Sequence, residues 1–206
     1  DPDKWATIIS KQKEFRLFSL RTAPEAFSST FARESAFTPD VWEDRARNPL
    51  ASTIVAVALD DDESATQDDV DILVKGKFVG ITVLLGPKEE SFAQASKSPW
   101  ETMKVESKNS DTNDINRALY CHMNAVFVDP AYKGLGIAKS LIDEAIVLGE
   151  VRSIDRGADA VGFTILVEKE NIAATKLYQK CHFNIVGEET IKSPRKEKAD
   201  GTPIPE

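Results

Sequence analysis

One segment of the chain joins a strand pattern, a glycine-containing turn and a helix pattern without a break. An apolar run ends at Asp129-Pro130, Gly134 and Gly136 follow, and apolar residues then recur at three- and four-residue spacing. Glycines let the backbone turn sharply and leave N–H groups unobstructed, while the helix N-terminus contributes about half a positive charge. Such a terminus suits a pyrophosphate group. The segment therefore predicts an anion-binding turn between a buried strand and a helix.

This turn differs from the two best-known phosphate loops. A dinucleotide fingerprint needs a third glycine at the position of Lys139. A Walker A loop needs glycines at the positions of Lys133 and Ala138. These differences argue against a dinucleotide-binding enzyme and against a nucleotide-binding switch protein.

The other periodic segments give the order of the elements. Apolar residues at helical spacing predict a helix over residues 4–20, and Thr38-Pro39 is a typical cap and first position for a second, shorter helix. Predicted strands cover residues 52–59, 77–85, 118–128, 160–167 and 183–191, and further predicted helices cover residues 134–150 and 171–181. This order predicts an α+β (mixed α/β) fold, in which helices cover the faces of a sheet.

The chain length of 206 residues fits one domain. We expect residues 1–192 to form it and residues 193–206, which are polar and contain prolines, to be a disordered tail. Residues 87–116 are too many for a simple connection, so they are either a surface insertion or a lid over a site. The acidic run at residues 60–69 lacks the glycine of a calcium loop and is expected to be a solvated hairpin loop.

Composition argues against several classes of partner. Because 26 Lys and Arg face 34 Asp and Glu, the formal net charge is −8, which disfavours nucleic acids and anionic membranes and favours a cationic acceptor. No apolar run approaches the roughly 18 residues of a membrane span, and no signal peptide is evident. The chain has only two cysteines, so we expect a reducing compartment, the cytoplasm or the nucleus.

Two motifs resemble those of the GCN5-related N-acetyltransferase (GNAT) superfamily. Lys133-Gly-Leu-Gly136-Ile-Ala138, preceded by Val128-Asp-Pro130-Ala-Tyr132, resembles the family's phosphate loop, Arg/Gln-x-x-Gly-x-Gly/Ala. Asn171-Ile-Ala-Ala174-Thr-Lys-Leu177-Tyr178-Gln-Lys-Cys-His182-Phe183 resembles its second signature, Asn-x-x-Ala-x-x-Leu-Tyr-x-x-x-Gly-Phe. The resemblance covers residues 4–191. The departures are Lys133 in place of Arg or Gln, His182 in place of glycine, and the lack of a strand pattern before Lys4.

The resemblance implies a central, mostly antiparallel twisted sheet with helices on both faces and a splayed pair of strands that holds acetyl-CoA. The pantetheine arm would bind the backbone of the third strand like an added strand. The amides of the glycine-containing turn would hold the pyrophosphate. The cofactor-binding residues implied in this way are Val126, Val128, Lys133, Gly134, Leu135, Gly136, Ile137, Ala138, Lys139, Asn171 and Tyr178. Asn171 is also a good helix N-cap.

For the chemistry, the resemblance places a general acid at Tyr178, which would protonate the departing thiolate. The alternative is a core tyrosine on an amphipathic helix. We expect His122 to be the general base, because its ordinary pKa of about 6.5 suits proton removal at neutral pH. Strand alternation would put Tyr120, His122, Asn124 and Val126 on one face, with an amide near Asn124 as the oxyanion donor.

Other assignments for the base stay open. His122 could instead be satisfied within the sheet. Tyr120, Glu101 or Glu106 are alternative bases. A metal site is not expected, because Cys121 and His122 are adjacent on a strand and point to opposite faces.

The expected function is acetyl-CoA-dependent N-acetyl transfer, directly to a primary amine of a small molecule. One alternative is the acetylation of a protein or peptide amine, and another is an acyl-CoA-binding module without turnover. We expect a monomer or a homodimer, with acetyl-CoA and an amine acceptor as partners and with no metal, nucleic acid or membrane.

Overall fold

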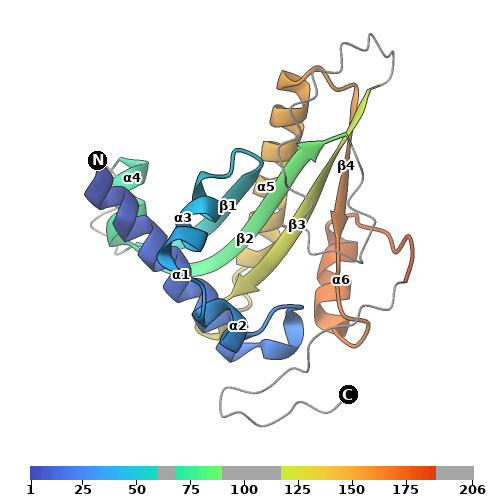
Figure 1. Ribbon diagram of the computed structural model, residues 1–206. Helices are drawn as coiled ribbons and strands as arrows, with labels where there is room; N and C mark the ends of the chain where they lie inside the picture. The colour runs from blue at the N-terminus through green and yellow to red at the C-terminus, as the bar shows by residue number, and fades with distance from the viewer. Residues whose placement is uncertain (60–67, 90–116, 189–206) are drawn as a thin grey trace.

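The computed structural model describes residues 1–59, 68–89 and 117–188, and these fold around one four-stranded sheet of order β1-β2-β3-β4 (Figure 1). Strands β1, β2 and β3 pair antiparallel, and β4 lies parallel to β3. In chain order the elements are α1 (Pro2–Thr22), η1 (Pro24–Ala26), α2 (Phe31–Ser35), α3 (Pro39–Arg47), β1 (Ala51–Ala58), α4 (Asp69–Lys75), β2 (Lys77–Lys88), β3 (Ala118–Val128), η3 (Pro130–Tyr132), α5 (Ile137–Asp155), β4 (Ala160–Ile165) and α6 (Ile172–Lys180).

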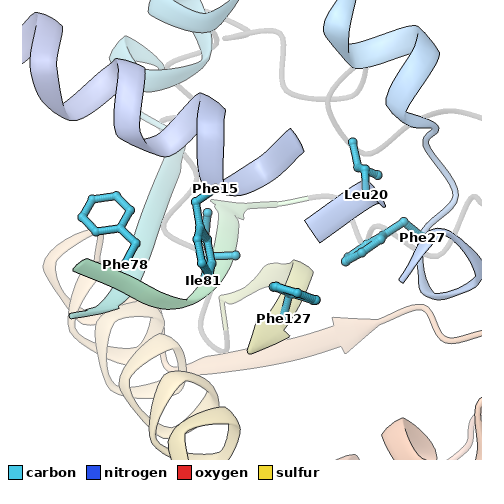
Figure 2. Close-up of a cluster of buried hydrophobic side chains, with 6 residues drawn as sticks. All are labelled: Phe15, Leu20, Phe27, Phe78, Ile81 and Phe127. Atoms are coloured by element: carbon cyan, nitrogen blue, oxygen red, sulfur yellow. The ribbon is translucent and has the colours of Figure 1, made fainter. Parts of the chain in front are cut away.

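The two faces of the sheet are covered by different helices, because side chains alternate along β2. On one face α1 packs against the sheet through a phenylalanine-rich cluster (Figure 2), whose members are Phe15, Leu20, Phe27, Phe78, Ile81 and Phe127. On the other face α5 lies along the sheet through a second cluster, whose members are Leu84, Cys121, Met123, Ile142, Ala145 and Cys181. The predicted α+β class with helices on both faces is confirmed.

Strand β3 carries a bulge that reverses the alternation of its side chains. Val83 pairs with Asn124 and Ile81 pairs with Phe127, so β3 has one residue more than β2 between these pairs. Ala125 takes up the extra residue with a positive φ of 58°. Val126 therefore packs with the cluster under α5. The expectation that Val126 shares a face with Tyr120, His122 and Asn124 was wrong, because the alternation slips at the bulge.

Strands β3 and β4 separate partway along their length. Their pairing runs from Ala118↔Ala160 to Met123↔Ile165, where β4 ends, but β3 continues to Val128. The last residues of β3 thus have a sheet neighbour on the β2 side alone within the described residues. This is the splayed strand pair that the resemblance implied.

Several predicted boundaries differ from the structure. Residues 183–188 form no strand, and Val186 is 96% exposed because it has no sheet to pack against. Strand β2 continues to Lys88, so the insertion expected from residue 87 begins later. The rest of that insertion with Glu101 and Glu106, residues 189–191 of the predicted strand and the tail at 193–206 lie outside the described residues.

Two short helices, α2 and α4, were not predicted. The end of the acidic run that was expected to be a loop begins α4, with Asp68 as its N-cap, whereas residues 60–67 lie outside the described residues. Asp69 and Asp71 lie in the first turn of α4, where they interact favourably with the helix dipole. At its other end Lys11 of α1 donates hydrogen bonds to the carbonyl oxygens of Leu73, Val74 and Gly76, at 2.8, 2.8 and 2.5 Å. The helix is thus closed by a cation from another element. None of the helices in the described part of the chain is both long and apolar enough to cross a membrane.

We expect Gly86→Ala to destabilise the sheet strongly. Gly86 has a φ of 109°, and a Cβ atom there would lie 2.6 Å from the backbone oxygen of Tyr120. The loss in the free energy of unfolding should be about 3 kcal/mol or more. Gly157→Ala is the matched control, because Gly157 has a φ of 72° but open space around it. It should cost only the backbone strain, about 1–2 kcal/mol. Equal losses in urea unfolding would show that the close approach at Gly86 is unimportant.

Candidate functional site

The turn between β3 and α5 takes the shape expected of an anion-binding loop. After η3 the chain passes through Gly134 and Gly136, whose φ values are 83° and 79°. An added Cβ would meet no atom within 4 Å at either position. Glycine is therefore favoured here by the left-handed backbone and not by tight packing. Leu135 between them is 70% exposed.

The start of α5 presents unpaired donors. Gly136 is its N-cap, and Ser140 N–H donates the first backbone hydrogen bond to Gly136 O at 3.1 Å. The amides of Ile137, Ala138 and Lys139 precede that bond and have no partner within the helix. No acidic side chain lies in the first turn of α5, and no side chain caps it. Nothing within the helix therefore competes with an anionic ligand at this terminus.

The open edge of β3 leads directly into this turn. Asp129 N–H donates to Val79 O of β2 at 2.9 Å. Backbone groups of successive strand residues point to opposite edges, so those of Val128 and Val126 point to the edge that β4 has left. A ligand with amide groups could pair there as an added strand.

Tyr178 on α6 is a half-buried side chain with an unused hydroxyl. Its ring packs against the cluster under α5 and lies 6.2 Å from the Phe183 ring, edge to face. Burial, with a smaller contribution from Cys181, raises the pKa of Tyr178 to about 12. The hydroxyl makes no hydrogen bond within the described part of the chain, so it is a protonated donor at neutral pH.

Asn171 begins α6 as a helix cap. Its side-chain oxygen accepts a hydrogen bond from Ala174 N–H at 3.1 Å. The N-cap role expected from the sequence is thus confirmed.

His122 is buried in the sheet, only 3% exposed, next to the point where β3 and β4 separate. Its Nδ1 lies 3.0 Å from the Thr164 hydroxyl oxygen, and that hydroxyl lies 3.3 Å from Cys121 O. A hydroxyl has one proton, and when Thr164 donates it to Cys121 O, His122 Nδ1 must carry the proton of the other bond. The lone pair is then on Nε2.

Burial, and to a smaller extent the charge of Lys88, lowers the pKa of His122 to about 4. The pKa of His122 in the folded protein is therefore lower than the value of about 6.5 expected from the sequence, because the sheet excludes water from the ring. His122 is neutral at pH 7 and is a weaker base than an exposed histidine. Tyr120, the alternative base, packs its ring over Gly162, where a Cβ would lie 2.8 Å from the ring.

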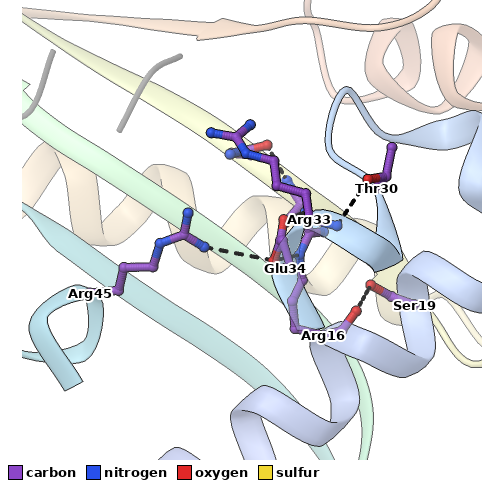
Figure 3. A network of polar contacts seen from close by, with 8 residues as sticks. Arg16, Ser19, Thr30, Arg33, Glu34 and Arg45 are labelled. Carbon is purple, nitrogen blue, oxygen red and sulfur yellow. Dashed lines mark hydrogen bonds and ion pairs between the residues drawn. The ribbon is translucent and has the colours of Figure 1, made fainter. Parts of the chain in front are cut away.

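A polar cluster that the sequence did not suggest lies on the opposite face of the sheet from α5 (Figure 3). Glu34 of α2 is 2% exposed and accepts two hydrogen bonds from Arg16, Nη2 to Oε1 at 2.7 Å and Nε to Oε2 at 3.0 Å. Arg45 Nη1 lies 3.7 Å from Glu34 Oε2. Burial opposes the ionised form, but the bonds and charges of Arg16, Ser29 and Arg45 outweigh it and lower the pKa of Glu34.

This cluster borders a hollow of about 30 Å³ between α1, α3, β2 and β3. Its wall includes Arg16, Trp42 and Arg45 from the helices and Asn124 and Ala125 from the bulge of β3. The cluster joins residues from three helices, so no local spacing in the sequence could have revealed it.

Metal ligands do not gather in the part of the chain that the structure describes. No group of three or more His, Cys, Asp or Glu side chains there could hold an ion. Cys121 and Cys181 are both free thiols and buried.

We expect the titration of His122 to appear in the stability of the protein. Between about pH 6.5 and pH 4 the unfolded state binds a proton at this position and the folded state does not, so the free energy of unfolding falls as the pH is lowered. A pKa difference of this size corresponds to about 3 kcal/mol. Urea unfolding across this range should show a smaller pH dependence for His122→Asn, whereas His182→Asn, on the surface, should follow the parent. Parallel curves for His122→Asn and the parent would contradict the lowered pKa.

Comparison with known proteins agrees with the two sequence motifs. The family model described as the acetyltransferase (GNAT) family matches residues 25–183. The chain is 33% identical over 70 residues to the peptidyl-lysine N-acetyltransferase YjaB of Salmonella typhimurium. That match covers 34% of this chain and 41% of the relative, so it spans less than half of the relative's length.

Two of the solved structures similar to this chain are acetyltransferases. The aminoglycoside 6'-N-acetyltransferase AAC(6')-IG from Acinetobacter haemolyticus has a TM-score of 0.50 at 12% identity, over 86% of this chain and 90% of that one. An acetyltransferase from Trypanosoma brucei has a TM-score of 0.46 at 18% identity, over 90% and 92% of the two chains. Because the family model matches more than half of the sequence, the chain belongs to the GNAT acetyltransferase family.

Proposed function

We propose that this protein is an acetyl-CoA-dependent N-acetyltransferase that transfers the acetyl group directly to an amine. The observation that carries the proposal is the continuity of two features. The unpaired edge of β3 at Val126 and Val128 leads within a few residues to the turn at Gly134 and Gly136. A ligand with an amide-bearing arm and a pyrophosphate can use both features at once. Acetyl-CoA is such a ligand, and the family membership supports it.

In this proposal each part of the cofactor has its own protein partners. The pantetheine amides pair with the backbone of Val126 and Val128. The pyrophosphate accepts hydrogen bonds from the turn and from the first amides of α5, with Lys133 as a nearby cation. Asn171 remains the N-cap of α6 and contacts the cofactor through its side-chain amino group. The pyrophosphate-binding residues are Lys133, Gly134, Leu135, Gly136, Ile137, Ala138 and Lys139.

The chemistry is direct attack of a neutral amine on the thioester carbonyl carbon. A C–N bond forms, the carbonyl oxygen becomes an oxyanion, and the C–S bond then breaks. An amide near Asn124 stabilises the oxyanion. The thiolate takes up a proton as it leaves, and we assign that proton to Tyr178, whose hydroxyl is protonated and makes no bond within the described residues.

We assign to His122 the role of general base, which accepts the proton that the attacking amine loses. Its Nε2 carries the lone pair when Nδ1 donates to Thr164. With a pKa of about 4, His122 is neutral at pH 7 and is a weak base. Its contribution is therefore greatest for an amine that already reaches the site in its neutral form. Tyr120 is the second candidate among the described residues.

For the acceptor we propose a primary amine on a small molecule. The alternative acceptor, a lysine of a protein or peptide, is favoured by the name of the relative YjaB, a peptidyl-lysine N-acetyltransferase. Titration calorimetry with acetyl-CoA, and with NAD and ATP as controls, tests the cofactor. Release of free thiol with a panel of amines and peptides then separates an enzyme from an acyl-CoA-binding module without turnover.

Replacing Gly136 by aspartate should abolish cofactor binding. A carboxylate at the N-cap of α5 would repel the pyrophosphate, so the Kd of acetyl-CoA should rise at least about 100-fold. Gly157→Asp is the matched control, because Gly157 also has a positive φ and open space but lies after the end of α5. Its Kd should stay within about threefold of the parent by the same reasoning. Equal losses in the two variants would remove the turn from the cofactor site.

Tyr178→Phe should lower kcat by about 10²- to 10⁴-fold and leave the Kd of acetyl-CoA nearly unchanged. The substitution removes one oxygen and keeps the ring contact with Phe183. Stopped-flow single-turnover kinetics measures the chemical step, and calorimetry measures the Kd. If kcat is unaltered, or if kcat and affinity fall together, Tyr178 is not the acid.

A further inference from the structure

We infer that the acceptor amine also carries a carboxylate, and that the hollow beside the bulge of β3 binds that carboxylate. The inference rests on the proposed function and names the substrate class. Its basis is two buried hydrogen-bond donors without an acceptor among the described residues, together with the side-chain amide of Asn124, on residues that line the same hollow.

The two buried donors are side-chain N–H groups of Arg16 and Trp42. Arg16 uses Nε and Nη2 for Glu34, and its Nη1 is buried without a hydrogen-bond partner among the described residues. The indole Nε1 of Trp42 is also buried without such a partner, on a residue that is only 6% exposed. Leaving a buried donor unpaired is unfavourable, so a ligand that pairs with it gains affinity. Both side chains line the hollow.

Asn124 adds a third donor at the same place. Its Oδ1 accepts a hydrogen bond from Ala125 N–H at 2.8 Å, so the side-chain oxygen is already in use. The group that Asn124 can offer to the hollow is its amino group. The side chains of Arg16, Trp42 and Asn124 therefore present donors, and the ligand must present acceptors.

The charged side chains that line the hollow also favour an anionic ligand. Arg16 Nη2 and Arg45 Nη1 lie 2.7 and 3.7 Å from the carboxylate of Glu34, whose pKa is lowered so that it is ionised at neutral pH. Burial lowers the pKa of Arg45, and the charges of Arg16 and Arg33 act in the same direction, against the attraction of Glu34. Among these three residues Arg16 and Arg45 line the hollow and Glu34 does not, so the side chains that face a ligand there favour an anionic group. This local sign is opposite to the net charge of −8 for the whole chain, from which a cationic acceptor was expected.

Size and position select a carboxylate on a short amine. A hollow of about 30 Å³ holds a group little larger than a water molecule, so it takes the anionic end of a ligand and not the whole ligand. Asn124 lies two positions before Val126, which places the hollow within about 7 Å of the cofactor edge along the strand. An amine at the thioester and a carboxylate in the hollow are then separated by a few bonds, as in an amino acid.

Product analogues test this assignment without turnover. We would titrate the protein, with and without CoA, with N-acetylglycine, N-acetylleucine and N-acetylglutamate and with their carboxamides, which lack the charge. The acids should bind at least about 10-fold more tightly than the amides, as expected for hydrogen bonds to a charged group. Equal affinity of acids and amides would overturn the inference. Failure of CoA to bind would instead overturn the proposed function. The titrations with the acids in the absence of CoA would still test the carboxylate site.

The matched variants are Trp42→Phe and Trp5→Phe. Both tryptophans have a buried Nε1 without a partner among the described residues, but Trp5 lies on a different part of α1, away from this hollow. Trp42→Phe keeps the ring and removes the donor, so the preference for acids should fall about 10-fold or more while affinity for CoA and for the amides is unchanged. Trp5→Phe should leave all of these unchanged. If Trp42→Phe retains the full preference, the carboxylate is bound elsewhere.

A turnover panel gives the corresponding comparison for an active enzyme. Glycine, leucine and glutamate should be acetylated with a kcat/KM at least about 10-fold higher than glycinamide, leucinamide and glutamic acid α-amide. A polyamine or an aminoglycoside should be poorer still. Higher kcat/KM for the amides or for the cationic amines would overturn the inference, even where acetyl-CoA is consumed.

Discussion

Strand β4 stops at Ile165 while β3 continues to Val128, and the site depends on the backbone groups that this difference leaves unpaired. In a sheet interior such groups would be used by the neighbouring strand. Here they face an open edge that runs straight into the turn before α5. The same termination of β4 places His122 next to the gap, since its partner Thr164 is the second-last residue of β4.

The bulge at Ala125 determines what each face of the sheet contributes at that point. Before the bulge, Asn124 faces the hollow on the side of α1 and α3. After it, Val126 packs under α5 and Phe127 joins the phenylalanine-rich cluster. One extra residue therefore places the side chain of Asn124 at the hollow and the open backbone edge at Val126 within two positions of each other. An unbulged strand would have kept Asn124 and Val126 on one face.

The cluster of Arg16, Glu34 and Arg45 shows why a buried charge is informative. The bidentate pair of Arg16 and Glu34 satisfies the Nε and Nη2 donors of the guanidinium group. The Nη1 group of Arg16 is buried and has no hydrogen-bond partner among the described residues. The carboxylate that we propose for the acceptor would supply an acceptor for this remaining donor.

Features set by nearby residues could be predicted from the sequence. The strand at Ala118–Val128 was predicted with its observed bounds, and the glycine turn and the cap at Asn171 were predicted from the motifs that form them. In each case the pattern of apolar residues, glycines and caps acts within one element. The fold class followed from the order of these elements.

Features set by distant residues needed the tertiary structure. The pKa of His122 depends on the sheet that buries it, and the slip at Ala125 depends on the register with β2. Helix α4 is closed by Lys11, and Glu34 is held by residues of two other helices. The sequence by itself determined the local elements and the glycine-containing turn before α5, because their causes lie within a few residues. Only the tertiary structure decided the pKa of His122, the bulge at Ala125 and the hollow lined by Arg16 and Arg45, because burial and long-range pairing create them.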